Sequence, residues 1–206
     1  MIGMAAVLLC GIILAAPSMA QDATPAEPSS LEERRADVQN APADPRARLE
    51  LGLAYFQAEE YDLAMAELVE AITLNPDNKD HLAAQANYHL GITLLAIDRA
   101  APAINAFREA LRLGWKDAGL SVALGQALTS QGHFDEAIVQ YREALRLAPD
   151  RIEAHAGLGF AYEVSGRVED AVAQYERYLQ SVPTTNDHTV NAIRQRLAAL
   201  KERRRM

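Results

Sequence analysis

Two stretches of the chain show nearly the same pattern of apolar and polar residues, 34 positions apart. The first is LGQALTSQGHFDEAIVQYREALRLAP, residues 124–149, and the second is LGFAYEVSGRVEDAVAQYERYLQSVP, residues 158–183. Apolar residues recur every three or four positions, which is the spacing of one face of an α-helix. A glycine, Gly132 or Gly166, interrupts each stretch and can end a helix in a left-handed conformation. The pattern therefore predicts a repeated helix-turn-helix unit.

Four Leu-Gly pairs give the register of these units. They begin at Leu51, Leu90, Leu124 and Leu158, so their spacings are 39, 34 and 34 residues. A large residue follows each glycine after three positions, an alanine after twelve, and a second large residue four beyond that alanine. The glycine and the alanine allow close approach of neighbouring helices, and the large residue fills the gap between them. The predicted structural signature is Gly52, Ala64, Gly91, Ala103, Gly125, Ala137, Gly159 and Ala171.

This pattern resembles the tetratricopeptide repeat (TPR), a helix-turn-helix unit of 34 residues. The resemblance extends over about residues 45–185 and implies an all-α fold: a right-handed α-solenoid of four helix-turn-helix repeats with a C-terminal capping helix. The expected repeat domain is 43–185, with units at about 45–78, 80–117, 118–151 and 152–185.

The chain departs from the family pattern in two places. The position at which the family has tryptophan holds Arg48, Asn87, Ser121 and His155. Five additional residues, 78–82, separate the first two units. We expect a longer first helix in unit two, capped at Asn78 or Asp80 and extended by about 7 Å, at about 1.5 Å per residue; a plain loop is the alternative.

The first twenty residues carry no charge and contain an apolar run from Ala5 to Ala16. Small residues at Ser18 and Ala20 suit a signal peptidase, so residues 1–20 predict a cleaved secretory signal. Two alternatives remain: residues 1–19 stay as an inner-membrane anchor, or Cys10 is acylated as in a lipoprotein. We therefore expect an exported, periplasmic protein, with membrane anchoring as the alternative.

Residues 21–42 begin with QDATPAEPSS and are expected to form a flexible linker that contains a short helix from about Leu31. At the other end, residues 186–206 carry an apolar stripe of helical spacing and predict a capping helix over the last repeat. The basic tail, Lys201 and Arg203–Arg205, either complements the helix dipole or contacts anionic lipid or an acidic partner.

Composition limits the chemistry. The net charge of −8 argues against nucleic acid as a partner. Cys10 is the only cysteine, so removal of the signal would leave a chain suited to an oxidising compartment, without thiolate sites or disulfides. The five histidines are scattered, and no phosphate-binding loop or nucleophile motif occurs. We therefore expect no catalytic residues, no metal site and no cofactor, and a protein that is not an enzyme.

In the TPR family the first helix of each unit lines a concave groove. The positions that face a ligand there correspond to apolar residues in units one and two, and to more polar ones beyond. Leu53 and Ile92 replace the asparagines with which some relatives bind a C-terminal carboxylate, so that clamp is absent. The candidates for peptide binding are Leu49, Leu53, Phe56, Tyr88, Ile92, Leu95, Gln126, Thr129, Phe160 and Glu163, together with Val122 and Ala156.

An apolar groove would accept an amphipathic helix or an extended peptide. Alternatively, these residues pack between units, or the N-terminal helix around residues 31–38 fills the groove. The predicted signal and the resemblance together predict a periplasmic scaffold or adaptor for another protein. Envelope assembly is the expected pathway, although the resemblance itself does not choose the pathway. The alternative functions are cytochrome c maturation and pilus or secretion assembly at the membrane.

Overall fold

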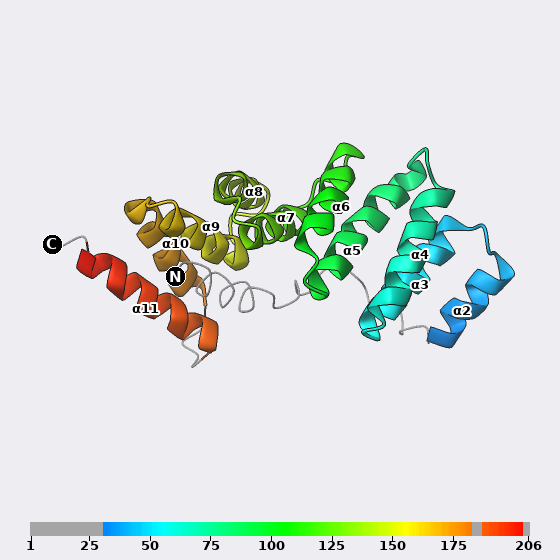
Figure 1. Cartoon of the computed structure of the whole chain (residues 1–206), viewed down its shortest axis with the longest axis horizontal. Helices are drawn as coiled ribbons and strands as arrows, with labels where there is room; N and C mark the ends of the chain where they lie inside the picture. The colour runs from blue at the N-terminus through cyan, green and yellow to red at the C-terminus, as the bar shows by residue number, and fades with distance from the viewer. Residues whose placement is uncertain (1–30, 183–186, 204–206) are drawn as a thin grey trace. The chain divides into compact units, whose positions relative to one another are not determined.

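The computed structural model describes residues 31–182 and 187–203, and every regular element within these ranges is a helix (Figure 1). The predicted signal with Cys10, the first part of the linker and Arg204–Arg205 lie outside the described residues. The described helices form two compact units, divided between Lys116 and Asp117.

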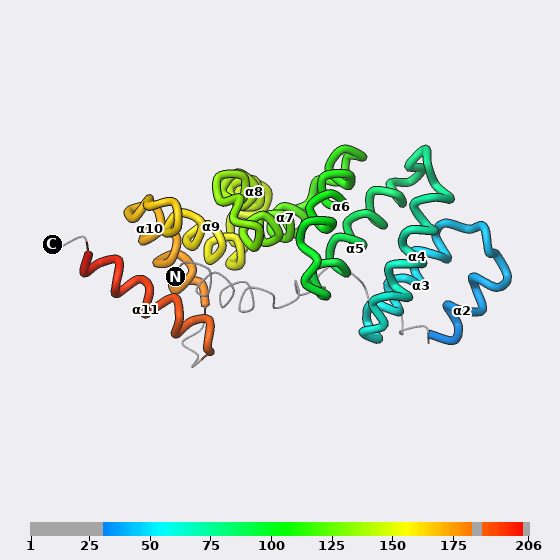
Figure 2. Tube along the Cα trace, viewed as in Figure 1, coloured from blue at the N-terminus to red at the C-terminus, as the bar shows by residue number. Residues whose placement is uncertain are grey.

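The first unit contains two helical hairpins preceded by a short helix, and the course of its chain can be followed in Figure 2. Asp44 is the N-cap of the first hairpin: its side chain accepts a hydrogen bond from the Arg46 backbone N at 2.9 Å, and Pro45 is the first helical residue. The short helix packs on the first hairpin, and the two hairpins pack on each other. The elements are α2 (Leu31–Asn40), α3 (Pro45–Gln57), α4 (Tyr61–Leu74), the 3₁₀ turn η1 (Lys79–His81), α5 (Leu82–Ala96) and α6 (Ala100–Arg112).

The second unit also contains two hairpins, followed by a single helix. Gly132 and Gly166 connect the helices of the hairpins with φ of +77° and +73°, a conformation that glycine adopts without a steric penalty. The last helix packs against α10 and buries Val190, Ile193, Leu197 and Leu200. The elements are α7 (Ala118–Ser130), α8 (Phe134–Leu147), α9 (Ile152–Val164), α10 (Val168–Ser181) and α11 (His188–Arg203).

Close helix contacts form at the glycines of the Leu-Gly pairs. A Cβ on Gly91 would lie 2.4 Å from the Phe107 ring, and a Cβ on Gly159 would lie 2.7 Å from the Tyr175 ring. Gly52 and Gly125 meet the corresponding side chains of α4 and α8 in the same way. Each hairpin is therefore held by one large side chain seated on a glycine of the facing helix.

The connection between the first two hairpins differs from our expectation. Helix α5 begins at Leu82 and has 15 residues, against 13 in α7 and α9, so it is longer by only about 3 Å. The predicted extension of about 7 Å is wrong, because Asp80 and His81 have positive φ and interrupt the helical path. The N-cap of α5 is His81 and neither Asn78 nor Asp80, although the Asn78 side chain accepts from the Ala84 backbone N in the first turn at 3.0 Å.

Candidate functional site

The first and second helices of the hairpins differ in how much of their surface is buried. On α5 and α7 eleven residues are buried, and on α9 nine. On α8 and α10, by contrast, only four residues are buried, and these lie on one face. Helices α5, α7 and α9 are therefore buried over most of their surface, whereas α3 buries five residues and α6 six. The predicted ligand-facing positions all lie on the first helices.

Four of the six candidates in the first unit belong to the core: Leu49, Tyr88, Ile92 and Leu95. Leu49 packs with Leu68, Ala71 and Leu82, between α3, α4 and α5. Tyr88 stacks on Trp115 with ring centroids 6.1 Å apart, and its ring lies 6.2 Å from that of Phe107. Substitution of Leu49 or Tyr88 would disturb packing, so neither can report specifically on ligand binding.

The remaining candidates on α3 are more exposed than those on α5. Leu53 and Phe56 on α3 are only partly buried: Leu53 borders the cluster around Leu49, and Phe56 borders the cluster formed by α2 and α3. Ile92 and Leu95 on α5 are 5 % and 8 % exposed. Helix α2 fixes one side of α3 through Val38 and through a hydrogen bond of 3.1 Å from Arg35 Nε to the Tyr55 hydroxyl.

In the second unit the polar candidates make contacts within the protein. Thr129 is buried, donates a hydrogen bond to the Gly125 carbonyl at 2.8 Å and lies 3.3 Å from the Tyr141 hydroxyl. Val122 and Ala156 are buried, and Gln126 is partly buried. The threonine is thus part of the α7–α8 contact.

The candidates of the last repeat are contacted by the protein's own C-terminal helix. The Arg196 guanidinium lies 5.2 Å from the centre of the Phe160 ring and donates to Glu163 Oε2 at 3.0 Å. The Tyr175 hydroxyl donates to the same carboxylate oxygen at 2.8 Å. Burial, and then the negative charge of Glu163, raise the pKa of Tyr175, so the phenol stays protonated as a donor. Glu163 therefore joins α9, α10 and α11.

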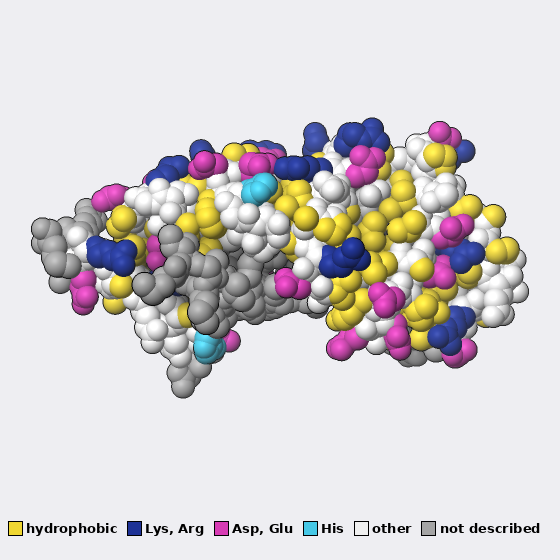
Figure 3. Space-filling view, viewed as in Figure 1, with side chains coloured by type: hydrophobic (Ala, Val, Ile, Leu, Met, Phe, Trp, Pro, Cys, Tyr) yellow, Lys and Arg dark blue, Asp and Glu magenta, His cyan; other side chains and the backbone are white. Residues whose placement is uncertain are grey.

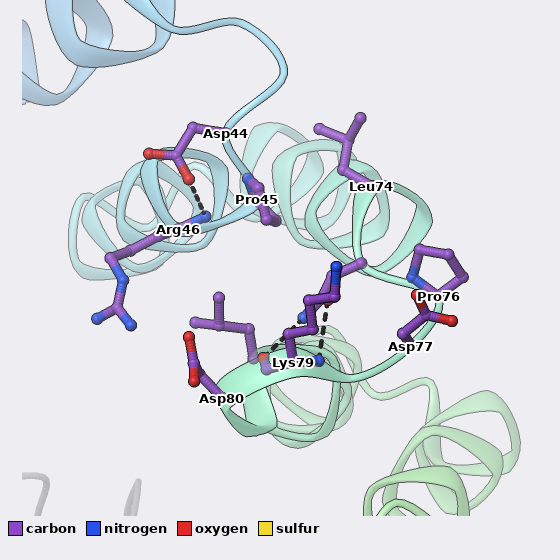
Figure 4. Close-up of a pocket in the computed structure, with 10 residues that line it drawn as sticks. Asp44, Pro45, Arg46, Leu74, Pro76, Asp77, Lys79 and Asp80 are labelled. Carbon is purple, nitrogen blue, oxygen red and sulfur yellow. Dashed lines mark hydrogen bonds between the residues drawn. The ribbon is translucent and has the colours of Figure 1, made fainter.

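A polar pocket of about 380 Å³ lies where the additional residues join the first two hairpins. Figure 4 shows Asp44, Pro45 and Arg46 at the start of α3 on one side, with Lys79 and Asp80 of the turn opposite. The turn is fixed by Asn75, whose side chain accepts from the Lys79 backbone N at 3.0 Å. Two cations and three carboxylates line the pocket: Arg46, Lys79, Asp44, Asp77 and Asp80. Sequence patterns did not predict this pocket, although the added residues marked its place.

The histidines His155 and His89 lie on first helices of the hairpins. No group of histidine, cysteine or acidic side chains within 31–182 and 187–203 could hold a metal ion. His155 is buried and links α9 to α10 through a contact of 2.8 Å from Nδ1 to Gln174 Oε1. Burial of the imidazole lowers the pKa of His89 to about 4, so this side chain is neutral at physiological pH.

Two family models match the chain. A model of the tetratricopeptide repeat matches residues 24–112, and a second TPR model matches residues 125–164, so together they cover more than half of the chain. The chain is a tetratricopeptide repeat protein. Consecutive packed helix pairs confirm the expected all-α repeat fold of TPR proteins. Among curated proteins, none matches this TPR chain.

Solved structures of TPR proteins are similar to this chain. A crystal structure of MamA has 26 % identity and a TM-score of 0.66, covering 73 % of this chain and 85 % of MamA. MamA from Desulfovibrio magneticus RS-1, from residue 41 onward, has 20 % identity and a TM-score of 0.66. The match covers 76 % of this chain and 86 % of that MamA chain. YrrB, a TPR protein with an unusual peptide-binding site, has 20 % identity and a TM-score of 0.70. The match covers 84 % of this chain and 86 % of YrrB.

The TPR fold supports a role in protein–protein interaction. None of the described helices is long and apolar enough to cross a membrane. Among the predicted candidates, the side chains of Leu53 and Phe56 are apolar and only partly buried. Their role in binding stays a prediction.

Proposed function

We propose that this TPR protein is an exported adaptor that binds an apolar peptide or an amphipathic helix of another protein along α3. The observation that carries the proposal is the pair Leu53 and Phe56. These two apolar side chains are partly exposed, at positions where the family contacts ligands. A helix with apolar residues three and four positions apart would bury both of them. No carboxylate clamp takes part, because Leu53 and Ile92 are apolar.

Site-specific photo-crosslinking in cells tests the binding site. A benzophenone amino acid replaces Phe56, whose ring it resembles, and in a control strain it replaces exposed Arg112 on α6. We expect an adduct with a discrete protein from position 56 that is missing from position 112. Identical adducts at both positions, or none at position 56, would contradict the proposal. The identity of the adduct separates envelope assembly from cytochrome c maturation and from pilus or secretion assembly.

Export is the second part of the proposal, and it rests on the apolar run in residues 1–20 and on the single cysteine within it. We expect the mature protein to begin at Gln21 and to be released with the periplasmic fraction. Intact-mass measurement of the purified chain, together with cell fractionation, tests this. A mass that retains residues 1–20, with the protein in the membrane fraction, would favour the anchored alternative. A cytoplasmic protein would overturn export altogether.

A further inference from the structure

Helix α4 has an apolar surface on the side that faces away from its hairpin. Its buried residues, Ala64, Leu68 and Ala71, face α3 and α5. Elsewhere on the helix, Leu63 and Val69 are 44 % and 49 % exposed, and the exposed Ala66 lies between them in the sequence. Spacing by three residues places side chains on one ridge of a helix, so Leu63, Ala66 and Val69 form an α4 ridge. Figure 3 shows hydrophobic side chains gathered over the region of α4 and α5, with acidic side chains near them.

Two of the other second helices, α6 and α8, carry charge pairs where α4 does not. At the position of Val69, α6 and α8 have arginine. In α6 and α8 a glutamate forms an ion pair with the arginine three residues later: Glu109 with Arg112 at 2.6 Å, and Glu143 with Arg146 at 2.7 Å. In α4 the matching residues are Glu70 and Thr73, which cannot form such a pair. The outer face of α4 therefore combines apolar side chains with carboxylates that lack this arginine partner.

On α4 itself every charged side chain is acidic, and Arg48 of the neighbouring helix α3 pairs with Glu67. From residue 49 to residue 78 the chain contains seven carboxylates and neither lysine nor arginine. Asp62 and Glu70 are exposed beside the ridge, and Glu59 and Glu60 lie just before the helix. Nearby cationic side chains would lower the free energy of these carboxylates, most strongly at low ionic strength.

We propose that the α4 ridge binds a cationic amphipathic helix of a partner protein, at a site separate from the inner side of the first helices. Apolar residues of the partner would cover Leu63 and Val69, and its lysines or arginines would lie beside Asp62 and Glu70. The α4 ridge of a second copy fits poorly, because symmetrical pairing would bring like carboxylates together. An anionic membrane is repelled for the same reason. Helix α11 of a second copy already buries its apolar stripe in its own fold.

A designed probe tests this surface in the full chain. The probe is a fluorescent leucine/lysine peptide with helical periodicity, and its binding is followed by fluorescence anisotropy. Two reference peptides are a scrambled sequence of the same composition and a leucine/glutamate peptide of the same pattern. The test variants are Leu63→Ser/Val69→Ser, which removes the apolar contact, and Asp62→Asn/Glu70→Gln, which removes the charge. The matched control is Val139→Ser on α8, where the valine is 60 % exposed.

We expect the leucine/lysine peptide to bind more tightly than both reference peptides. Leu63→Ser/Val69→Ser should weaken binding about tenfold or more, and Asp62→Asn/Glu70→Gln should weaken it and reduce its salt dependence. Val139→Ser should leave the affinity unchanged. All substituted residues are exposed, so circular dichroism should be the same for every variant. Equal binding by the scrambled peptide, an equal loss in Val139→Ser, or unchanged affinity in Leu63→Ser/Val69→Ser would overturn the proposal. Self-association that is lost only in Leu63→Ser/Val69→Ser would overturn it in favour of a second copy.

Discussion

The ring of Tyr141 lies against two glycines, Gly125 and Gly157, and Gly157→Ala tests the second of these contacts. A Cβ on Gly157 would lie 2.4 Å from Tyr141 Cζ, and a Cβ on Gly125 would lie 2.7 Å from the same ring on α7. Tyr141 is fully buried, and its hydroxyl lies 3.3 Å from Thr129. The ring is therefore enclosed by α7 and α9 and has no free space into which it can retreat.

Two effects of opposite sign determine the free energy of unfolding of Gly157→Ala. Replacing glycine by alanine inside a helix stabilises it by about 1 kcal/mol. Overpacking a filled core costs about 1–3 kcal/mol, and the enclosed ring places this site near the upper end. We therefore expect a net destabilisation of about 2 kcal/mol. Tyr141→Leu alone should cost about 3 kcal/mol through the cavity that it leaves.

A double-mutant cycle separates the contact from other effects. In Gly157→Ala/Tyr141→Leu the ring atoms that meet the new methyl group are gone, so the pair should be more stable than the sum of the single changes by about 2 kcal/mol or more. Urea unfolding followed by far-UV circular dichroism measures each free energy of unfolding. If Gly157→Ala alone is neutral or stabilising, or if the two changes are additive, the close contact does not limit the packing of α8 against α9.

Three further predictions concern other contacts. Glu163→Ala removes the acceptor shared by Tyr175 and Arg196. The free energy of unfolding should fall by about 1–3 kcal/mol, and hydrogen exchange in α11 should become faster. Unchanged exchange in α11 would show that apolar packing alone holds the helix. Asp98→Gly should raise the melting temperature by relieving the positive φ of 58°, a gain of about 0.5–1 kcal/mol, whereas a lower melting temperature would contradict it. The folded pKa of His89, about 4, lies below the ordinary value of 6.5, so between these pH values the unfolded chain binds a proton that the folded chain does not. Stability should therefore fall as the pH falls through this window, by at most about 1.4 kcal/mol per pH unit, and His89→Gln should flatten that part of the profile.

The helices and their pairing could be predicted because local patterns determine them. The Leu-Gly pairs place a glycine under each large side chain of the second helix, and this relation holds within one hairpin. Asp44 and Pro45 likewise act as an N-cap and first helical residue, as their types suggest. Gly157 was missed, because its contact is with Tyr141 of the preceding hairpin, and no spacing within one repeat reveals a contact between repeats.

The candidate site was harder to predict than the fold, because residues at equivalent positions of a repeat have different neighbours. Leu49 and Leu53 are one turn apart, yet one lies in the core and the other is partly exposed. Glu163 occupies a predicted ligand-facing position, but the arginine that pairs with it, Arg196, comes from 33 residues later. The family pattern describes the average repeat, and α11 lies outside that pattern.

Residues that depart from the repeat pattern fall into two groups: those that gain a contact within the protein, and those that remain exposed without one. Arg48 replaces an apolar family residue, and Arg48 Nη1 lies 2.7 Å from Glu67, so its charge serves the α3–α4 contact. His155 also makes an internal contact, from Nδ1 to Gln174 Oε1, which links α9 to α10. Leu63 and Val69 belong to the second group, because each remains nearly half exposed. Full burial of a side chain of this size stabilises a protein by about 1.5–3 kcal/mol. A partner that covers the α4 ridge would recover roughly half of that free energy at each residue, so an interaction specific to this chain is best sought there.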